Sequence, residues 1–178
     1  MVVYQDIISG DEFFYGSHPF TLVDDLYYEV YGRYILIRSG GVKDTELGGN
    51  RFAKLVPAEQ PAEQPEKLEE VIDLVEECQL QNCPHISQEK YFPEYLKPYT
   101  QTLIAYYEKQ GKEKADIVKD KLNQFRVILR EKFKSDNFQF FEGRSHPSEG
   151  MIALVGHKEK DGKEIPYMIL FKDGLKEV

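Results

Sequence analysis

A chain of 178 residues in which 41% are apolar and 30% are charged is long enough to bury a full core and too apolar to stay disordered. Its net charge of −8 argues against duplex DNA and anionic membranes as main partners, because both attract positive surfaces. We predict a single domain over residues 1–178. Since we find neither a signal-peptide pattern nor a run of about 20 apolar residues, we expect a cytoplasmic location without membrane insertion.

The amino-terminal part of the chain predicts strands. Residues 1–8 are rich in β-branched side chains, which favour an extended backbone. Residues 22–37 have the pattern of a hairpin, in which alternating residues are followed by Gly32-Arg33 as the expected turn and by a returning apolar run.

Residues 39–67 predict a long mobile loop. Gly40 and Gly41 open it, and two consecutive Pro-Ala-Glu-Gln repeats at residues 57–64 are typical of an extended linker of low complexity. A connection of this length is either functional or mobile, and we expect mobility.

Periodicity does not decide the structure of residues 68–80. Leu68, Val71 and Val75 fit the spacing of a helix, and the glutamates between them favour one. Alternation over the same residues also fits a strand with one mixed face. Both structures therefore stay open from the residues alone.

Residues of about 87–134 predict a helical hairpin. Ser87 is a suitable N-cap, and Gly111 separates two amphipathic segments that the short link places antiparallel. Pro93 and Pro98 interrupt the first segment. We therefore expect either a regular helix that begins near Pro98 or a kinked one.

The carboxyl-terminal part returns to strands. Apolar and aromatic runs at residues 138–141, 151–155 and 165–171 have the length of buried strands, and Asp161-Gly162 is typical of a tight turn between the last two. Strands, a helical hairpin and strands again predict an α+β fold with an antiparallel or mixed sheet.

Catalytic and metal-binding patterns are not found in the sequence. It has no phosphate loop, no nucleophile elbow and no calcium loop, and its four histidines lack ligand-like spacing. Cys78 and Cys83 are spaced C-x4-C, which is a poor zinc or redox signature. We therefore expect no enzyme and no required cofactor. A weak calcium site assembled from distant carboxylates stays open.

Several short motifs resemble the translationally controlled tumour protein family. They are the run at residues 150–154, the run at 166–175, the opening at residues 4–12, the Gly-Gly-Asn triplet at 48–50 and the aromatic stretch at 138–141. The resemblance extends over the whole chain in order.

The resemblance implies a β-tent fold related to Rab-binding guanine-nucleotide-release proteins, with a projecting helical hairpin and a mobile loop. It also implies that residues 71–80 form a strand. The same fold serves methionine sulfoxide reductases, but the paired zinc-binding cysteines of those enzymes are absent here. A thiol-dependent enzyme would have to use Cys78 or Cys83.

The resemblance further implies a non-enzymatic regulatory binding protein in growth control. Its implied partners are small GTPases of the Rheb or Rab kind and translation elongation factors. Glu12, with Asp11 beside it, matches the acid that is proposed to contact the GTPase.

An alternative is a calcium-binding, microtubule-associated adaptor. Residues 87–135 hold 11 Lys and Arg against 7 Asp and Glu, so the predicted hairpin is basic within an acidic chain. We expect Lys119 and Lys121 to face the acidic surface of tubulin in that case. A solvated lysine-rich helix face explains the same pattern.

Overall fold

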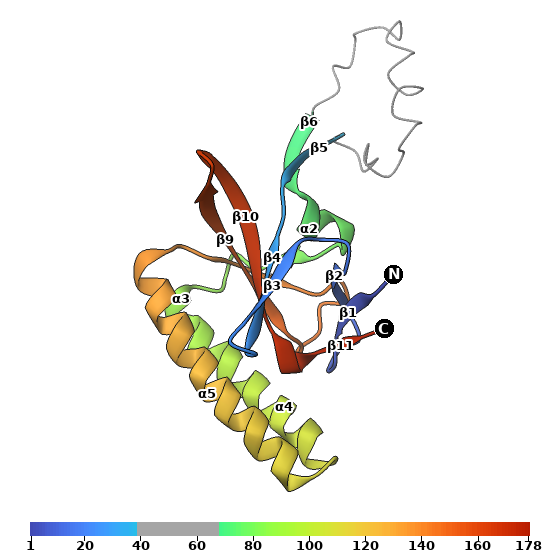
Figure 1. Ribbon diagram of the computed structural model, residues 1–178, viewed down its shortest axis with the longest axis vertical. Coiled ribbons are helices and arrows are strands. Elements are labelled where there is room, and N and C mark those ends of the chain that lie inside the picture. Colours follow the sequence, from blue (N-terminus) through green and yellow to red (C-terminus); the bar gives the residue numbers. More distant parts are fainter. Residues whose placement is uncertain (39–67) are drawn as a thin grey trace, which may run out of the picture.

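A computed structural model describes residues 1–38 and 68–178 (Figure 1). It confirms the predicted α+β fold, with antiparallel sheets and a helical hairpin. The loop predicted over residues 39–67 lies outside the described residues.

The largest sheet among the described residues has six antiparallel strands. In spatial order they are β3 (Phe20–Val23), β4 (Tyr27–Tyr31), β10 (Lys163–Phe171), β9 (Ile152–Lys160), β8 (Gln139–Glu142) and β7 (Gln81–Asn82). The predicted turn between β9 and β10 is present, because Asp161 and Gly162 both have positive φ. Strand β10 is central, and its residues from Pro166 onward are buried.

The amino-terminal hairpin lies elsewhere than predicted. Strand β4 pairs with β3, and the turn between them contains Asp24 and Asp25, whose φ angles are +51° and +58°. Gly32 is not a hairpin turn, because the strand that follows it pairs with a different partner. A Cβ at Gly32 would lie 2.7 Å from an oxygen of Asp73, so the glycine is needed for close packing.

Residues 68–80 combine both structures that the sequence left open. Strand β6 (Leu68–Ile72) pairs with β5 (Tyr34–Arg38), and helix α2 (Asp73–Glu77) follows at once. The strand implied over residues 71–80 is therefore wrong beyond Ile72. At the change, the Asp73 carboxylate accepts hydrogen bonds from the backbone N–H groups of Arg33 and Leu74, at 2.9 and 2.7 Å.

The two ends of the chain share a third sheet. Strand β1 (Val3–Asp6) lies between β2 (Glu12–Tyr15) and β11 (Leu175–Glu177), all antiparallel. The backbone N–H of Val3 donates to the Val178 carbonyl, and that of Val178 donates to the Val3 carbonyl. In Figure 1 the two termini accordingly lie side by side.

The helical hairpin is confirmed, with an irregular start. It runs through α3 (Gln88–Lys90), the π-helical turn η3 (Tyr91–Leu96), α4 (Lys97–Glu108) and α5 (Lys112–Ser135). Ser87 caps the first turn by accepting a hydrogen bond from the Lys90 N–H. Pro93 lies in the π-helical turn and Pro98 begins the regular helix, so both expectations for the prolines hold in part. The end of the hairpin where α4 leads into α5 extends past the sheets (Figure 1).

Aromatic contacts attach the hairpin to the six-stranded sheet. Phe125 of α5 packs against Phe171 of β10 and Tyr27 of β4, with ring centroids 5.2 and 5.7 Å apart. Tyr91 stacks on Phe140 of β8 at 5.1 Å. These buried rings join both helices and the sheet into one hydrophobic core.

Candidate functional site

Asp11 has its carboxylate directed into the protein. It is buried, and it accepts a 2.7 Å hydrogen bond from the hydroxyl of Ser145. Gly143 approaches it so closely that an added Cβ would overlap the carboxylate. Asp11 therefore fixes the loop after β8 against the start of β2.

Glu12, the next residue, begins strand β2 and remains partly exposed. The hydroxyl of Tyr15 donates a hydrogen bond to its carboxylate, at 3.2 Å, which limits the positions that the side chain takes. Burial, together with the nearby Cys78 and Glu12, raises the pKa of Tyr15 to about 12. Tyr15 is therefore a neutral hydrogen-bond donor near pH 7.

A second carboxylate lies next to this pair. Glu77 at the end of α2 contacts the imidazole of His18 at 2.5 Å, and the His18 ring stacks on Tyr15 at 6.0 Å. The side chain of Glu77 is 43% exposed, whereas that of His18 is only 9% exposed. We call Glu12, Tyr15, His18 and Glu77 the Glu12 surface. It presents the carboxylate of Glu12, oriented by Tyr15, and that of Glu77, which already contacts His18. The Glu12 carboxylate suits contact with a cation of a partner.

Lys121, one of the two lysines predicted for partner binding, already has partners within the chain. Its ammonium lies 2.8 Å from Asp25 and 3.7 Å from Asp173. Lys172 also reaches Asp25, at 2.5 Å. The hydrogen bonds and charges of Lys121 and Lys172 lower the pKa of Asp25 to about 2. Lys121 thus holds the β3–β4 turn against α5.

Lys119 lies on another side of the same helix. Two residues along an α-helix are about 200° apart, so Lys119 and Lys121 do not form one site. Lys119 lines a groove of about 490 Å³ between α4 and α5. Asp11 and Glu12 lie instead at the start of β2, away from the helical hairpin (Figure 1).

The two cysteines lack the features of a catalytic nucleophile. Cys78 and Cys83 are both buried and reduced. Burial raises the pKa of Cys83 to about 11, whereas a reactive thiol needs a lowered one. Among the described residues, no cluster of His, Cys, Asp or Glu side chains is suited to hold a metal ion.

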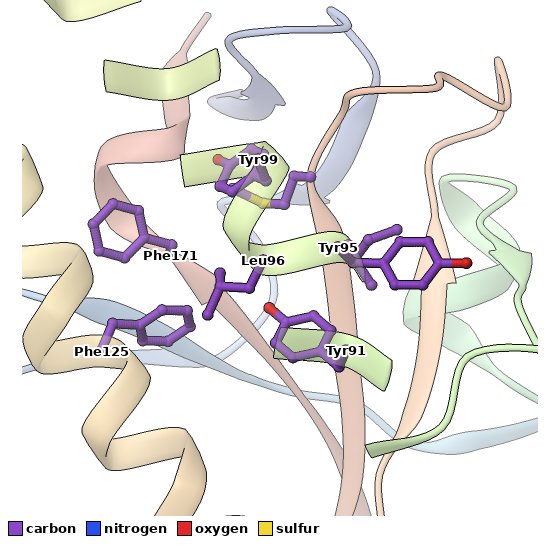
Figure 2. A pocket seen from close by; sticks show the side chains of 8 residues that line it. Tyr91, Tyr95, Leu96, Tyr99, Phe125 and Phe171 are labelled. Atoms are coloured by element: carbon purple, nitrogen blue, oxygen red, sulfur yellow. The ribbon is translucent and has the colours of Figure 1, made fainter. Parts of the chain in front are cut away.

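A small internal cavity lies where the hairpin meets the sheet. Figure 2 shows Tyr91, Leu96 and Tyr99 of the first helical segment opposite Phe125 and Phe171. Its volume of about 10 Å³ is close to the minimum for one water molecule, so it is too small for a substrate. The hydroxyl of Tyr99 is fully buried and has no hydrogen-bond partner among the described residues.

No helix in the described part of the chain has both the length and the apolarity that a membrane span requires.

Comparisons with known proteins agree over nearly the whole length. The family model described as translationally controlled tumour protein matches residues 1–176. The translationally-controlled tumor protein homolog of Drosophila melanogaster is 35% identical over 178 residues, which cover 99% of this chain and 98% of the relative. The homolog of Branchiostoma belcheri is 32% identical over 186 residues, with the same coverage. None of these names describes an enzyme.

Solved structures show the same similarity. The translationally controlled tumor-associated protein p23fyp of Schizosaccharomyces pombe superposes with a TM-score of 0.72 at 28% identity, covering 99% of this chain and 98% of the other. The NMR structure of the Caenorhabditis elegans protein gives a TM-score of 0.67 at 26% identity, covering 99% and 97%.

Proposed function

The chain belongs to the translationally controlled tumour protein family, and on that premise we propose that it is a non-enzymatic regulatory protein that binds a small GTPase through the Glu12 surface. The GTPase would be of the Rheb or Rab kind. The observation that carries the proposal is the partly exposed carboxylate of Glu12, oriented by a hydrogen bond from the hydroxyl of Tyr15.

In this proposal, Glu12 pairs with a basic residue in a switch region of the GTPase. A charge pair that loses its water on binding typically loses about 2–5 kcal/mol of affinity when one partner is truncated. Asp11 contributes indirectly, because its buried carboxylate fixes the backbone that precedes Glu12 through Ser145.

Capture of GTPases tests the assignment. The chain and its Glu12→Ala variant are used to capture a panel of nucleotide-free and nucleotide-loaded small GTPases, and nucleotide release is timed for each one captured. We expect the unsubstituted chain to prefer the nucleotide-free form and to accelerate release. Glu12→Ala should capture less with a nearly unchanged melting temperature, because among the described residues the Glu12 side chain accepts a single hydrogen bond, from Tyr15.

Glu131→Ala is the matched control, because Glu131 is an exposed acid on α5 whose partner within the described part of the chain is the exposed Lys134. Equal capture by all three chains would reject Glu12 as the contact. Failure to capture any GTPase would reject the proposed function.

We propose further that the protein acts in the cytoplasm, in growth control, and that translation elongation factors are also among its partners. It requires no cofactor in this proposal, and any calcium it binds is held weakly. Calcium titration followed by NMR checks the last point, since a weak site shifts only the amides near it and does so at millimolar concentrations.

A second candidate function is a microtubule-associated, calcium-binding adaptor that uses the helical hairpin. The exposed position of Lys119 on α5 favours it. Salt-sensitive co-sedimentation with microtubules should weaken in Lys119→Glu. Lys121→Glu needs a thermal control, because the change would place an acid beside Asp25 and Asp173. Co-sedimentation that neither variant alters would reject this candidate.

A further inference from the structure

The groove between α4 and α5 has two chemically different sides. Its apolar side runs from the π-helical turn η3, which holds Phe92 and Leu96, into α4, which holds Ile104. Its basic side follows α5, where Lys119, Arg126 and Arg130 recur at intervals of seven and four. The spacing on α5 places its three cations on one face of that helix, and the groove has an apolar row opposite this cationic row.

The cations of this groove have no carboxylate partner among the described residues, and the Arg130 guanidinium lies over the ring of Phe92, 5.3 Å from its centroid. Of its lining residues, Lys97, Lys119, Arg126 and Arg130 are cationic and none is acidic. Within the described part of the chain, none of the four lies in ion-pair distance of a carboxylate. By contrast, Lys121 and Lys132, which face the sheets, contact Asp25 and Glu29 respectively.

The dimensions of the groove match a short helix. The cationic row from Lys119 to Arg130 on α5 is about 16 Å long at 1.5 Å per residue. Three turns of a partner helix have the same length. The volume of about 490 Å³ lies within the range of ligand-binding clefts, although the groove is open along its side.

We propose that the α4–α5 groove binds an acidic amphipathic helix of a partner protein. The apolar stripe of that helix packs on the partly exposed Phe92 and Ile104, while Leu96 is buried between the groove and the core. The Glu or Asp side chains of the partner helix pair with the cations of α5. This site is separate from the Glu12 surface, and it rests on the protein-binding role proposed above. It requires no GTPase.

A helix fits this arrangement better than other anions. A lipid or a single phosphate has one anionic group and engages one or two cations, whereas the α5 row spreads three over about 16 Å. A nucleic acid has repeated charges but no continuous apolar face for the α4 row, and the net charge of −8 opposes its approach. Carboxylates at intervals of three and four residues on a helix match the spacing of the row.

The probe is a fluorescein-labelled helical peptide of 18 residues, built from Leu, Ala and Glu, with leucines on one face and glutamates beside it. Its counterpart carries Lys in place of every Glu. Fluorescence anisotropy measures the Kd at low and high salt, and amide NMR shifts locate the peptide. We expect the acidic peptide to bind with a micromolar Kd and to bind more weakly at high salt. The basic peptide should bind at least tenfold more weakly. The NMR shifts should be confined to the hairpin.

Charge reversal locates the site. Lys119→Glu combined with Arg126→Glu should weaken peptide binding at least tenfold. The matched control is Lys109→Glu combined with Lys112→Glu, which reverses two exposed charges outside the groove and should change the Kd less than twofold. Ile104→Gln should weaken binding at high salt as well, because it acts on the apolar side.

Three outcomes would overturn the proposal. They are equal binding of the acidic and basic peptides, no effect of the groove variant, and stronger groove-dependent binding to phosphatidylserine vesicles than to the peptide. Glu12→Ala should bind the peptide like the unsubstituted chain. Loss of GTPase capture and loss of peptide binding therefore report on separate sites.

Discussion

Replacing Glu29 by glutamine tests how the hairpin is held to the sheets. The Glu29 side chain on β4 is only 7% exposed. Its carboxylate accepts hydrogen bonds from Lys158 of β9 at 2.7 Å and from Tyr31 at 3.0 Å, and Lys132 of α5 lies 3.6 Å away. Glutamine keeps the shape of the side chain and removes its charge, so two lysines lose their counter-ion.

We expect Glu29→Gln to lower the free energy of unfolding by about 2–3 kcal/mol. A hydrogen bond to a charged group contributes about 1.5–3 kcal/mol, and a more exposed ion pair about 0–1 kcal/mol. Loss of one partner of a fully buried pair would cost about 3–5 kcal/mol. That value is too high here, because Lys158 and Lys132 are 41% and 23% exposed and regain water.

Urea unfolding followed by circular dichroism measures the change, since the chain has no tryptophan. The midpoint should fall while the slope stays constant. For a chain of this size, the melting temperature should fall by about 4–12 °C. The matched control is Glu131→Gln on α5, whose pair with Lys134 is about 70% exposed on both sides. It should cost less than about 0.5 kcal/mol.

The pH dependence gives an independent check. Burial opposes ionisation of Glu29, but the hydrogen bonds from Lys158 and Tyr31 and the two lysine charges outweigh it, so its pKa is lowered from 4.5. A lowered pKa means that this stabilisation is complete above about pH 4.5 and is lost as the pH falls below it. The difference in free energy of unfolding between Glu29→Gln and the unsubstituted chain should therefore become smaller as the pH falls through that range. If Glu29→Gln lowers the free energy of unfolding by less than about 0.5 kcal/mol at pH 7, the reasoning is refuted.

Four further predictions concern single side chains. Tyr99→Phe removes a buried hydroxyl that lacks a partner among the described residues, so the free energy of unfolding should stay equal or rise by up to about 1 kcal/mol; a clear loss in urea unfolding would reveal a missed partner. Gly174→Ala places a Cβ against that hydroxyl and should cost about 1–3 kcal/mol, part of which Tyr99→Phe restores in the double variant. The Asp25 carboxyl should titrate near pH 2 in NMR. A titration midpoint near 3.8 would contradict its pairing with two lysines. The stabilisation from this pairing is lost as the pH falls from about 3.8 through 2. Ser87→Ala should cost about 1 kcal/mol in thermal unfolding through loss of its cap.

Local signals predicted the helical hairpin well, whereas strand pairing needed information that the sequence does not display. Ser87 and Gly111 mark helix boundaries by a mechanism confined to a few residues, and both predictions held. Gly32 was misinterpreted because glycine serves turns and close contacts alike, and the contact with Asp73 lies 41 positions along the chain. Asp24-Asp25 gave a weaker turn signal than Asn-Gly, although aspartate tolerates positive φ.

For the candidate sites too, local sequence patterns were visible, whereas contacts between distant residues were not. Charge counting pointed to Lys121, but Asp25, 96 positions away, neutralises it in the fold. The spacing of Lys119, Arg126 and Arg130 on one helix face was visible in the sequence. Its significance became clear only when α4 supplied the apolar row opposite it.

The shared sheet of the two chain ends has a mechanical consequence. Val3 and Val178 form the outermost pair of an antiparallel ladder, so a force applied through both ends loads these hydrogen bonds one after another. Bonds loaded in series yield at lower force than bonds sheared together. Strand β11 should therefore peel away from β1 before the six-stranded sheet yields, and optical-tweezers traces should show a small early extension.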